Sequence, residues 1–265
     1  MVEFTVGRQS RIKTIAIRVK NRDKMIEFYR DMIGFSLKRE ENELAIFGTI
    51  DQPNELLWLE ESPRAEDFLG EIKKLQRLRL VVSDTEAAEI LKRLNDREYA
   101  LEYVTYEQAW GILVADPEGN PLEIYYEATE TAPEELATQA TGTFAGLTEP
   151  AHFGKVHLHA SNLNEEVLFF DEYLKLADFV AADGTSEASF EVELTEAHGG
   201  TIDLETHKVL GLDFFKVSVT NQELEALENR LEAKKQSFYY DKKKGILTIY
   251  DAIGLEWWFV ADAAN

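Results

Sequence analysis

A strand-like alternation of apolar and polar residues, followed by a helix-like pattern, recurs four times along the chain. Residues 16–35 and 158–179 each show a strand pattern, a short polar turn and an amphipathic helix with an aromatic pair, Phe28-Tyr29 or Phe169-Phe170. Residues 77–94 and 214–231 carry weaker copies. Because two or three short strand patterns follow each copy, the sequence predicts four βαβββ modules. One such module cannot bury its own apolar face, so the modules must pair in an α+β fold.

Short motifs accompany these modules. V-x-N/D precedes the helix, F-Y-x(4)-G-F follows it, and DPEGNPLEIYY occupies 116–126. With these motifs the chain resembles the vicinal oxygen chelate, or glyoxalase/bleomycin-resistance, superfamily. REENELAIFG at 39–48, WLEESPRAED at 58–67 and IGLEWWF at 253–259 are similar to the CppA family of two-domain bacterial proteins. The first resemblance implies tandem glyoxalase-like domains, and the second implies a proteinase that degrades complement, hence a hydrolase.

Residues 128–150 separate the two halves of the repeat. This segment is rich in Ala, Thr, Glu and Pro and lacks apolar periodicity, which is typical of a linker. We therefore expect an N-terminal glyoxalase-like domain at 1–127 and a C-terminal one at 151–265, with sequential modules pairing inside each half. Phe144 and Leu147 are candidates to dock on a domain. Exchange of modules between halves or chains stays open, so a homodimer is possible.

Composition limits which binding partners and which cellular location are expected. With 28 basic and 50 acidic residues the formal net charge is −22, which repels phosphate backbones, so no nucleic-acid partner is expected. The absence of cysteine excludes disulfides and thiolate chemistry. The sequence shows neither a signal-peptide pattern nor an apolar stretch long enough to cross a bilayer, which predicts a cytoplasmic protein without a membrane partner.

The superfamily resemblance implies a divalent metal at the floor of a cup formed by two paired modules. Motif alignment assigns four floor positions to the N-terminal half, Thr14, Trp58, Arg77 and Glu123, and four to the C-terminal half, Lys155, Asp203, Phe214 and Trp258. Each half keeps one carboxylate and gains one fixed positive charge, which opposes a bound cation. No metal cofactor is therefore expected, and Glu123 should pair with a basic residue, first of all Arg77.

The histidines raise one other possibility, because all five lie in the C-terminal half. In KVHLHAS, strand alternation points His157 and His159 into the cup, and in TIDLETH it points Asp203 and Glu205 the same way. These four side chains have the donor types to bind zinc and activate water, the one route to proteinase catalysis in this sequence. The alternative is a polar cleft wall without chemistry.

Aromatic residues favour a binding site. Trp58 and Trp258 replace metal ligands and would give the cup floors apolar surface, which is typical of small-molecule and peptide sites. The expected ligand cleft comprises Trp58, Arg77, Glu123, Lys155, Glu256 and Trp258. The first hypothesis is thus a metal-independent protein of the CppA type that binds a small organic ligand or peptide segment. The alternatives are the proteinase with His157, His159, Asp203 and Glu205, and a structural or interaction module with degenerate sites.

Overall fold

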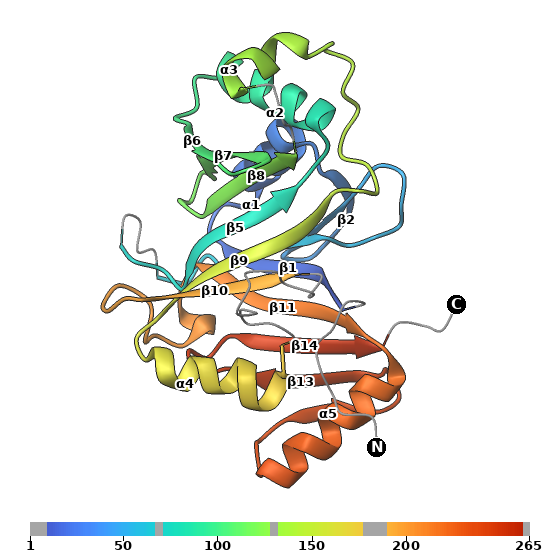
Figure 1. The fold of residues 1–265 in the computed structure, drawn as a ribbon, viewed down its shortest axis with the longest axis vertical. Coiled ribbons are helices and arrows are strands. Elements are labelled where there is room, and N and C mark those ends of the chain that lie inside the picture. Colours follow the sequence, from blue (N-terminus) through green and yellow to red (C-terminus); the bar gives the residue numbers. More distant parts are fainter. Residues whose placement is uncertain (1–9, 67–70, 128–131, 177–189, 262–265) are drawn as a thin grey trace.

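A computed structural model describes residues 10–66, 71–127, 132–176 and 190–261 of the chain. Within these residues the strands of all modules form one continuous 14-stranded sheet. Figure 1 shows strands β5, β9, β1, β11 and β14 following one another along the long axis of the molecule. The predicted α+β class is confirmed.

The N-terminal half contains modules 1 and 2. Module 1 comprises β1 (Arg11–Val19), α1 (Arg22–Glu27), the π-helical turn η1 (Phe28–Ile33), β2 (Ser36–Glu41), β3 (Leu44–Gly48) and β4 (Leu57–Glu61). Module 2 comprises β5 (Leu75–Val81), α2 (Asp84–Asp96), β6 (Glu102–Thr105), β7 (Ala109–Ala115) and β8 (Pro121–Glu127).

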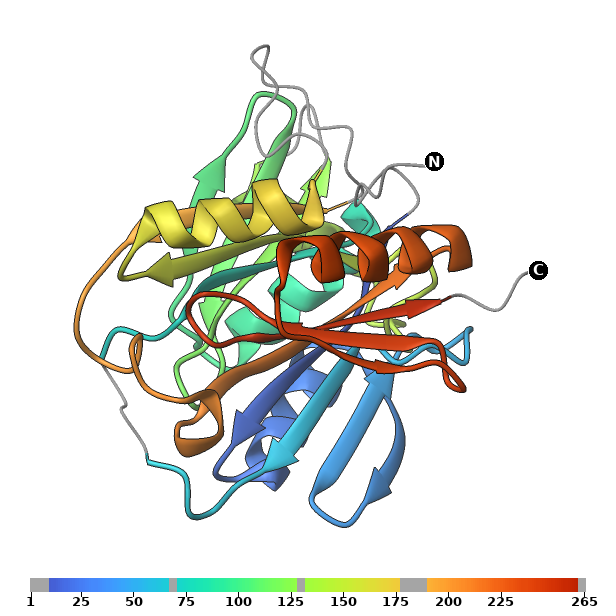
Figure 2. The same cartoon turned by 90° about the horizontal axis from the view of Figure 1, so that it is seen from below.

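The C-terminal half contains modules 3 and 4. Module 3 comprises β9 (His152–Ala160), α4 (Leu163–Leu168), the π-helical turn η3 (Phe169–Leu174) and β10 (Glu191–Glu196), followed by the short 3₁₀ helix η4 (Thr206–Lys208). The strand patterns expected in 177–189 lie outside the described residues. Module 4 comprises β11 (Gly211–Val219), α5 (Asn221–Lys234), β12 (Tyr239–Asp241), β13 (Ile246–Tyr250) and β14 (Glu256–Ala261). Figure 2 shows α5 lying across the strands of module 4.

Helix starts distinguish odd from even modules. In modules 1 and 3 an asparagine, Asn21 or Asn162, caps the helix through its side-chain oxygen, and a π-helical turn with the aromatic pair follows. In modules 2 and 4 the helix begins with a capping box, in which Ser83 or Thr220 exchanges hydrogen bonds with the residue three positions on. Module 1 therefore resembles module 3 locally, and module 2 resembles module 4.

The sheet joins modules across the two halves. In every module the first and last strands are parallel neighbours, but β1 pairs antiparallel with β11, and β5 pairs antiparallel with β9. The expected pairing of sequential modules is therefore wrong: module 1 joins module 4, and module 2 joins module 3. The two half-sheets meet where Ile12 on β1 pairs with Phe153 on β9. The domain boundaries at 127 and 151 stay a prediction.

TIDLETH, predicted as the last strand of module 3, is not a strand. Gly199 and Gly200 have φ of 87° and 57°, and a Cβ on Gly200 would lie 2.1 Å from the carbonyl oxygen of Ile72. The chain turns here and continues into η4, with Ile202 buried and Leu204 38% exposed. Of the two apolar residues whose alternation suggested a strand, only Ile202 is buried. The last strand of module 3 is β10, which pairs with β9.

The segment between the halves packs against α2. It contains α3 (Pro133–Leu136) and the 3₁₀ turn η2 (Ala137–Gln139). Leu147 is fully buried, and the Phe144 ring lies 4.6 Å from the Arg93 guanidinium carbon. The backbone N–H of Thr148 donates to Glu86 of α2 at 2.8 Å. The prediction that Phe144 and Leu147 dock on a domain is confirmed.

The core lies between the helices and one face of the sheet. On β14, Trp257 is fully buried there, with its ring centroid 4.5 Å from Phe215 and 5.4 Å from Phe170. Strand alternation then turns Trp258 to the opposite, concave face. Among the described residues, no helix combines the length and the apolar character needed to cross a membrane.

Candidate functional site

Cross-pairing of the modules creates two cups, each built from both halves of the chain. We call the one formed by modules 1 and 4 the aromatic cup, because Trp58, Phe214 and Trp258 stand on it. We call the one formed by modules 2 and 3 the ionic cup, defined by Arg77, Glu123, Lys155, His157 and Glu193. The residues expected in the ligand cleft are therefore regrouped: Trp58, Glu256 and Trp258 belong to the aromatic cup, and Arg77, Glu123 and Lys155 belong to the ionic cup.

Three aromatic rings in contact form one wall of the aromatic cup. Phe214 on β11 and Trp258 on β14 stack with their ring centroids 4.5 Å apart and planes 5° apart. Trp58 on β4 meets Phe214 edge-on at 5.6 Å, and its indole nitrogen donates to Glu55 at 3.1 Å. The Lys216 ammonium lies 4.0 Å from the Trp58 ring centroid, and burial lowers the pKa of Lys216. These contacts fix the wall as a rigid apolar surface.

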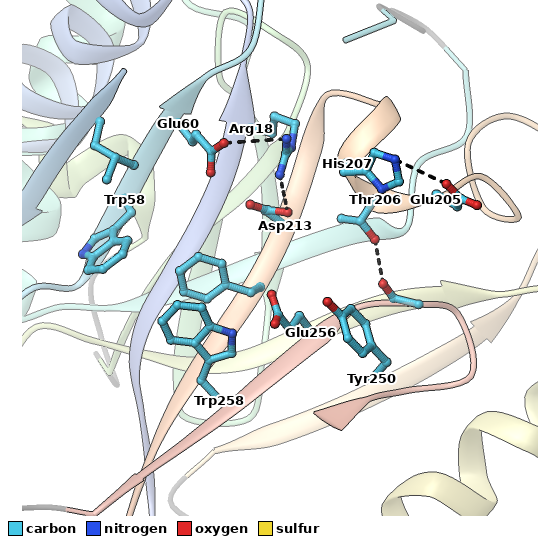
Figure 3. A pocket seen from close by; sticks show the side chains of 13 residues that line it. Arg18, Trp58, Glu60, Glu205, Thr206, His207, Asp213, Tyr250, Glu256 and Trp258 are labelled. Atoms are coloured by element: carbon cyan, nitrogen blue, oxygen red, sulfur yellow. Dashed lines mark hydrogen bonds and ion pairs between the residues drawn. The ribbon is translucent and has the colours of Figure 1, made fainter. Parts of the chain in front are cut away.

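A cavity of about 600 Å³ opens beside this wall (Figure 3). It is lined by Arg18, Leu44, Trp58, Glu60, Glu205, Thr206, His207, Asp213, Phe214, Tyr250, Gly254, Glu256 and Trp258. A neighbouring cavity of about 540 Å³ shares Tyr250, Glu256 and Trp258 with it and continues along module 4. The aromatic cup is thus open and elongated.

A β-bulge turns an aspartate into this cavity. Ala16 of β1 pairs with Phe214, but Ile17 pairs with Leu212, so Asp213 is an extra residue on β11. The bulge lets Asp213 and Phe214, although adjacent in sequence, both line the cavity. There the Arg18 guanidinium donates to Asp213 at 2.8 Å.

Two further carboxylates, Glu60 and Glu256, face the same space. The Arg18 guanidinium lies 3.7 Å from Glu60. Burial raises the pKa of Glu60, an effect that Arg18 opposes and Asp213 reinforces. Burial also raises the pKa of Glu256, and Asp213 adds to the shift. The cavity therefore combines an apolar wall with partly buried negative charge.

The rim of the cavity comes from η4 and the turn before β14. The Thr206 hydroxyl donates to the carbonyl oxygen of Gly254 at 2.7 Å, which ties the two segments together. Glu205 lies here with His207 and Lys208 at 3.3 and 2.8 Å. This expected zinc ligand belongs to the rim of the aromatic cup and not to the histidines of β9.

Glu123 is the fully buried centre of the ionic cup. Arg79 contacts both of its oxygens at 3.2 Å, the Arg77 Nε lies 3.4 Å away, and the Tyr106 hydroxyl donates at 2.6 Å. The predicted pairing of Glu123 with Arg77 is confirmed as an ion pair, while Arg79, which the sequence reading overlooked, supplies the bidentate contact.

His157 extends this network to module 3. The Arg77 guanidinium donates to Nε2 of His157 at 3.1 Å, and Nδ1 lies 3.5 Å from Glu193. Lys155 contacts Glu193 at 2.8 Å and Glu191 at 3.3 Å. Burial and Arg77 lower the pKa of His157 to about 4, so the imidazole is neutral at neutral pH. A cavity of about 570 Å³ lies beside Arg77, His157 and Glu193.

The parallel register identifies the floor positions in both cups. Trp58 pairs with Ala16, Glu123 with Arg79 and Trp258 with Lys216, each two residues beyond the first floor residue of its module. On β9 and β10 the same offset from Lys155 selects Glu193, not Asp203.

The aromatic cup therefore has Thr14, Trp58, Phe214 and Trp258 at its floor positions, and the ionic cup has Arg77, Glu123, Lys155 and Glu193. The only oxygen donor in the aromatic set is the Thr14 hydroxyl, which donates to a backbone carbonyl at 2.6 Å. In the ionic set two fixed cations already face the two carboxylates. Neither set fits a divalent metal. In the described part of the chain, no group of three or more His, Asp or Glu side chains is arranged to hold one.

The structure does not assemble the predicted histidine and carboxylate cluster. His157 lies in the ionic cup, whereas Nδ1 of His159 contacts the carbonyl oxygen of Lys73 at 2.8 Å. Asp203 accepts a hydrogen bond from Ser161 at 2.6 Å, and Glu205 lies on the other cup. The expectation that these four converge is wrong, because Asp203 and Glu205 are not on a strand.

Sequence reasoning also missed Arg18, Glu60 and Asp213. Asp213 had a visible signal, since it interrupts the apolar strand GLDFFKVSV. Glu60 stands two residues after Trp58 and therefore on the same face of β4. Arg18 had no local signal, because its role depends on β11, nearly 200 residues further along the chain.

Comparisons with known proteins agree with this architecture. Residues 12–129 match the model of the CppA N-terminal family, and residues 155–259 match that of the CppA C-terminal family. No curated protein matches the sequence.

Solved structures show the same fold. The cppA protein from Streptococcus pneumoniae TIGR4 has a TM-score of 0.64 at 19% identity, with 94% of this chain and 97% of that chain covered. A proposed dioxygenase from Bacillus subtilis has a TM-score of 0.70 at 14% identity, covering 100% and 87%. Glyoxalase I from Zea mays has a TM-score of 0.58 at 14% identity, covering 96% and 92%. Identities this low establish the fold alone.

Proposed function

The chain belongs to the CppA family, and we propose that it binds a small organic molecule, or a segment of a peptide, in its aromatic cup. One observation carries this proposal: Trp58, Phe214 and Trp258, from two modules, line a single open cavity of about 600 Å³. Ligand pockets typically measure about 300–1,000 Å³ and combine apolar walls with a few convergent polar groups. Arg18, Glu60, Asp213 and Glu256 are those polar groups.

Binding in this cup is proposed to need no metal ion. The floor residues offer indole, phenyl and one hydroxyl group, which hold a ligand by apolar contact and not by coordination. Metal analysis of protein purified without chelators or affinity-tag metals tests this point. Stoichiometric zinc, iron or manganese in such a preparation would contradict it.

Proteolysis is not proposed as a second function, because the geometry on which it rested is not present. His157 is held between Arg77 and Glu193, and its lowered pKa makes it a weak base. The two carboxylates predicted to assist it are not beside it: Asp203 accepts a hydrogen bond from Ser161, and Glu205 lies on the rim of the aromatic cup.

Ligand binding can be tested with the tryptophans themselves. A screen of aromatic, acyl and short peptide compounds, read by intrinsic fluorescence and repeated by calorimetry, should find compounds that saturate the signal. Trp58→Phe and Trp258→Phe should weaken the binding of such compounds. Trp110→Phe is the matched control, because Trp110 lies on β7, outside the aromatic cup, and packs against the core.

The interaction-module alternative gives the opposite result. If no compound binds, or if Trp110→Phe weakens binding as much as Trp258→Phe, the aromatic cup is not a ligand site.

A further inference from the structure

We infer that the ligand of the aromatic cup is an organic cation with an apolar tail, whose ammonium-type head lies among Glu60, Asp213 and Glu256. This inference rests on the proposed function and names the class of ligand for the same cavity.

The charges that line the cavity are unbalanced. Among its described lining residues, four carboxylates, Glu60, Glu205, Asp213 and Glu256, face one guanidinium, that of Arg18. Arg18 donates to Asp213 at 2.8 Å and lies 3.7 Å from Glu60, so its charge is already engaged. Glu205 has His207 and Lys208 beside it on the rim. Arg18 is shared between Asp213 and Glu60, and none of the ion pairs among the described residues involves Glu256, so the described cavity wall carries more negative than positive charge.

Partial burial makes that charge costly in the empty cup. Burial raises the pKa of both Glu60 and Glu256, and the nearby Asp213 reinforces both shifts. Around Glu256 the facing groups are Asp213, the Tyr250 phenol and the Trp258 indole, none of which carries positive charge at neutral pH. A bound cation would supply the missing counter-charge in a partly desolvated site, where it is worth more than on the open surface.

The aromatic wall suits the same kind of head. Indole and phenyl faces attract cations within about 6 Å of the ring centroid. The chain already uses this wall in that way, since the Lys216 ammonium lies 4.0 Å from the Trp58 ring and 5.7 Å from that of Trp258. Lys216 is not one of the residues that line the cavity.

Space for an apolar tail follows from the neighbouring cavity of about 540 Å³. It shares Tyr250, Glu256 and Trp258 with the first cavity. It adds the apolar surface of Phe238, Tyr239 and Ile246, and one residue of each charge, Asp241 and Lys244. A head near Glu256 can therefore be followed by a chain or ring that runs along module 4. Polar head and apolar tail would each meet a surface of matching character.

The ionic cup shows what a balanced site looks like. There Arg77 and Arg79 contact Glu123, and Lys155 contacts Glu193, so each buried or partly buried carboxylate has its own cation. Charge balance therefore predicts no preference for a cationic ligand in the ionic cup. A substitution in that cup can serve as a control.

Three compounds with one tail test the inference: 4-phenylbutylamine, 4-phenylbutan-1-ol and 4-phenylbutanoate. Calorimetry on the full chain at pH 7.5 should show the amine binding at least about tenfold more tightly than the alcohol, a difference of about 1.4 kcal/mol, and the carboxylate binding most weakly. Glu60→Gln and Glu256→Gln should each remove most of the preference for the amine and leave the affinity for the alcohol within about twofold. Glu193→Gln, in the ionic cup, should leave the preference intact.

The outcomes separate this inference from the proposed function. Binding of the alcohol or the carboxylate as tightly as the amine overturns the cation inference and leaves the ligand site standing. Failure of all three compounds to bind counts against both. Loss of alcohol binding in Glu256→Gln, with an unchanged thermal melt, would show that Glu256 shapes the cup and does not select charge.

Discussion

The aromatic cup and the ionic cup share one strand plan and differ in how their charges are matched. In the ionic cup the buried carboxylate Glu123 has two guanidinium partners and a phenol. In the aromatic cup Glu256 lies beside Asp213, Tyr250 and Trp258, and none of these three described neighbours carries a positive charge. A network that is satisfied internally stabilises the fold, whereas one left unsatisfied is suited to a ligand.

The difference arises from the floor positions. In the ionic cup Arg77 and Lys155 bring their own positive charges to the floor. The aromatic cup has rings at three of its floor positions, and rings bring no positive charge to the surrounding carboxylates. One architecture can therefore carry either an internally ion-paired floor or an apolar wall.

The largest difference between the two cups should appear when the buried carboxylate of the ionic cup, Glu123, is substituted. Glu123→Gln leaves Arg77 and Arg79, 24% and 14% exposed at their side chains, without a counter-charge, and should lower the free energy of unfolding by about 3–5 kcal/mol. Glu256→Gln is the matched change in the aromatic cup and should alter it by less than about 1 kcal/mol. Urea unfolding of both variants measures the difference. Equal losses would mean that both cups are structural networks.

The turns before β8 and β14 extend the comparison to the two halves. Asp116 accepts a hydrogen bond from the Tyr29 phenol at 2.9 Å. At the equivalent turn Asp251 faces the carboxyl group of Glu166, and the Ile253 N–H donates to Glu166 at 3.2 Å. Burial and Asp251 raise the pKa of Glu166 to about 9, and burial raises that of Asp251 to about 6. The second turn therefore holds a proton that the unfolded chain releases.

The sign of the pH effect follows from that proton. Because the folded-state pKa of Glu166 is raised, its contribution to stability is complete below its ordinary pKa and is lost as pH rises toward about 9. Between pH 6 and 8 the wild-type protein should lose stability relative to Glu166→Gln by up to about 1.4 kcal/mol per pH unit. Unfolding in urea at several pH values measures this slope. Tyr29→Phe, at the first turn, should lower stability without changing the slope.

A smaller effect of opposite sign should come from His157. Its pKa is lowered to about 4, so the unfolded chain binds a proton that the folded ionic cup excludes, and stability should fall as pH drops from about 6.5 toward 4. His157→Gln should reduce the fall of the free energy of unfolding between pH 6.5 and 4, by at most about 1.4 kcal/mol per pH unit. His207→Gln, on the exposed rim of the aromatic cup, is the control. If both variants keep the wild-type slope, His157 is not the group that titrates.

Local features of the modules were readable from the sequence because they depend on neighbours a few residues apart. The V-x-N motif places Asn21 directly before its helix, and the cap that Asn21 makes reaches only three residues, to the backbone N–H of Lys24. The docking of Phe144 and Leu147 followed from two large apolar residues in a largely polar segment. The strand prediction for TIDLETH was wrong for a local reason too. Gly199 and Gly200 favour a turn directly before this segment, and the strand-like alternation of its apolar residues did not reveal that turn.

What the sequence determined by itself is the βαβββ module, its repetition and all the floor residues except Glu193, in whose place it predicted Asp203. Those depend on strand and helix periodicity and on residue chemistry, which are local. Only the tertiary structure decided which modules pair, because every module offers a similar strand edge and apolar face, and no local pattern distinguishes one partner from another. That choice brought Trp58 and Trp258, expected in separate cups, to one cavity, and placed Arg18 against Asp213 across strands nearly 200 residues apart.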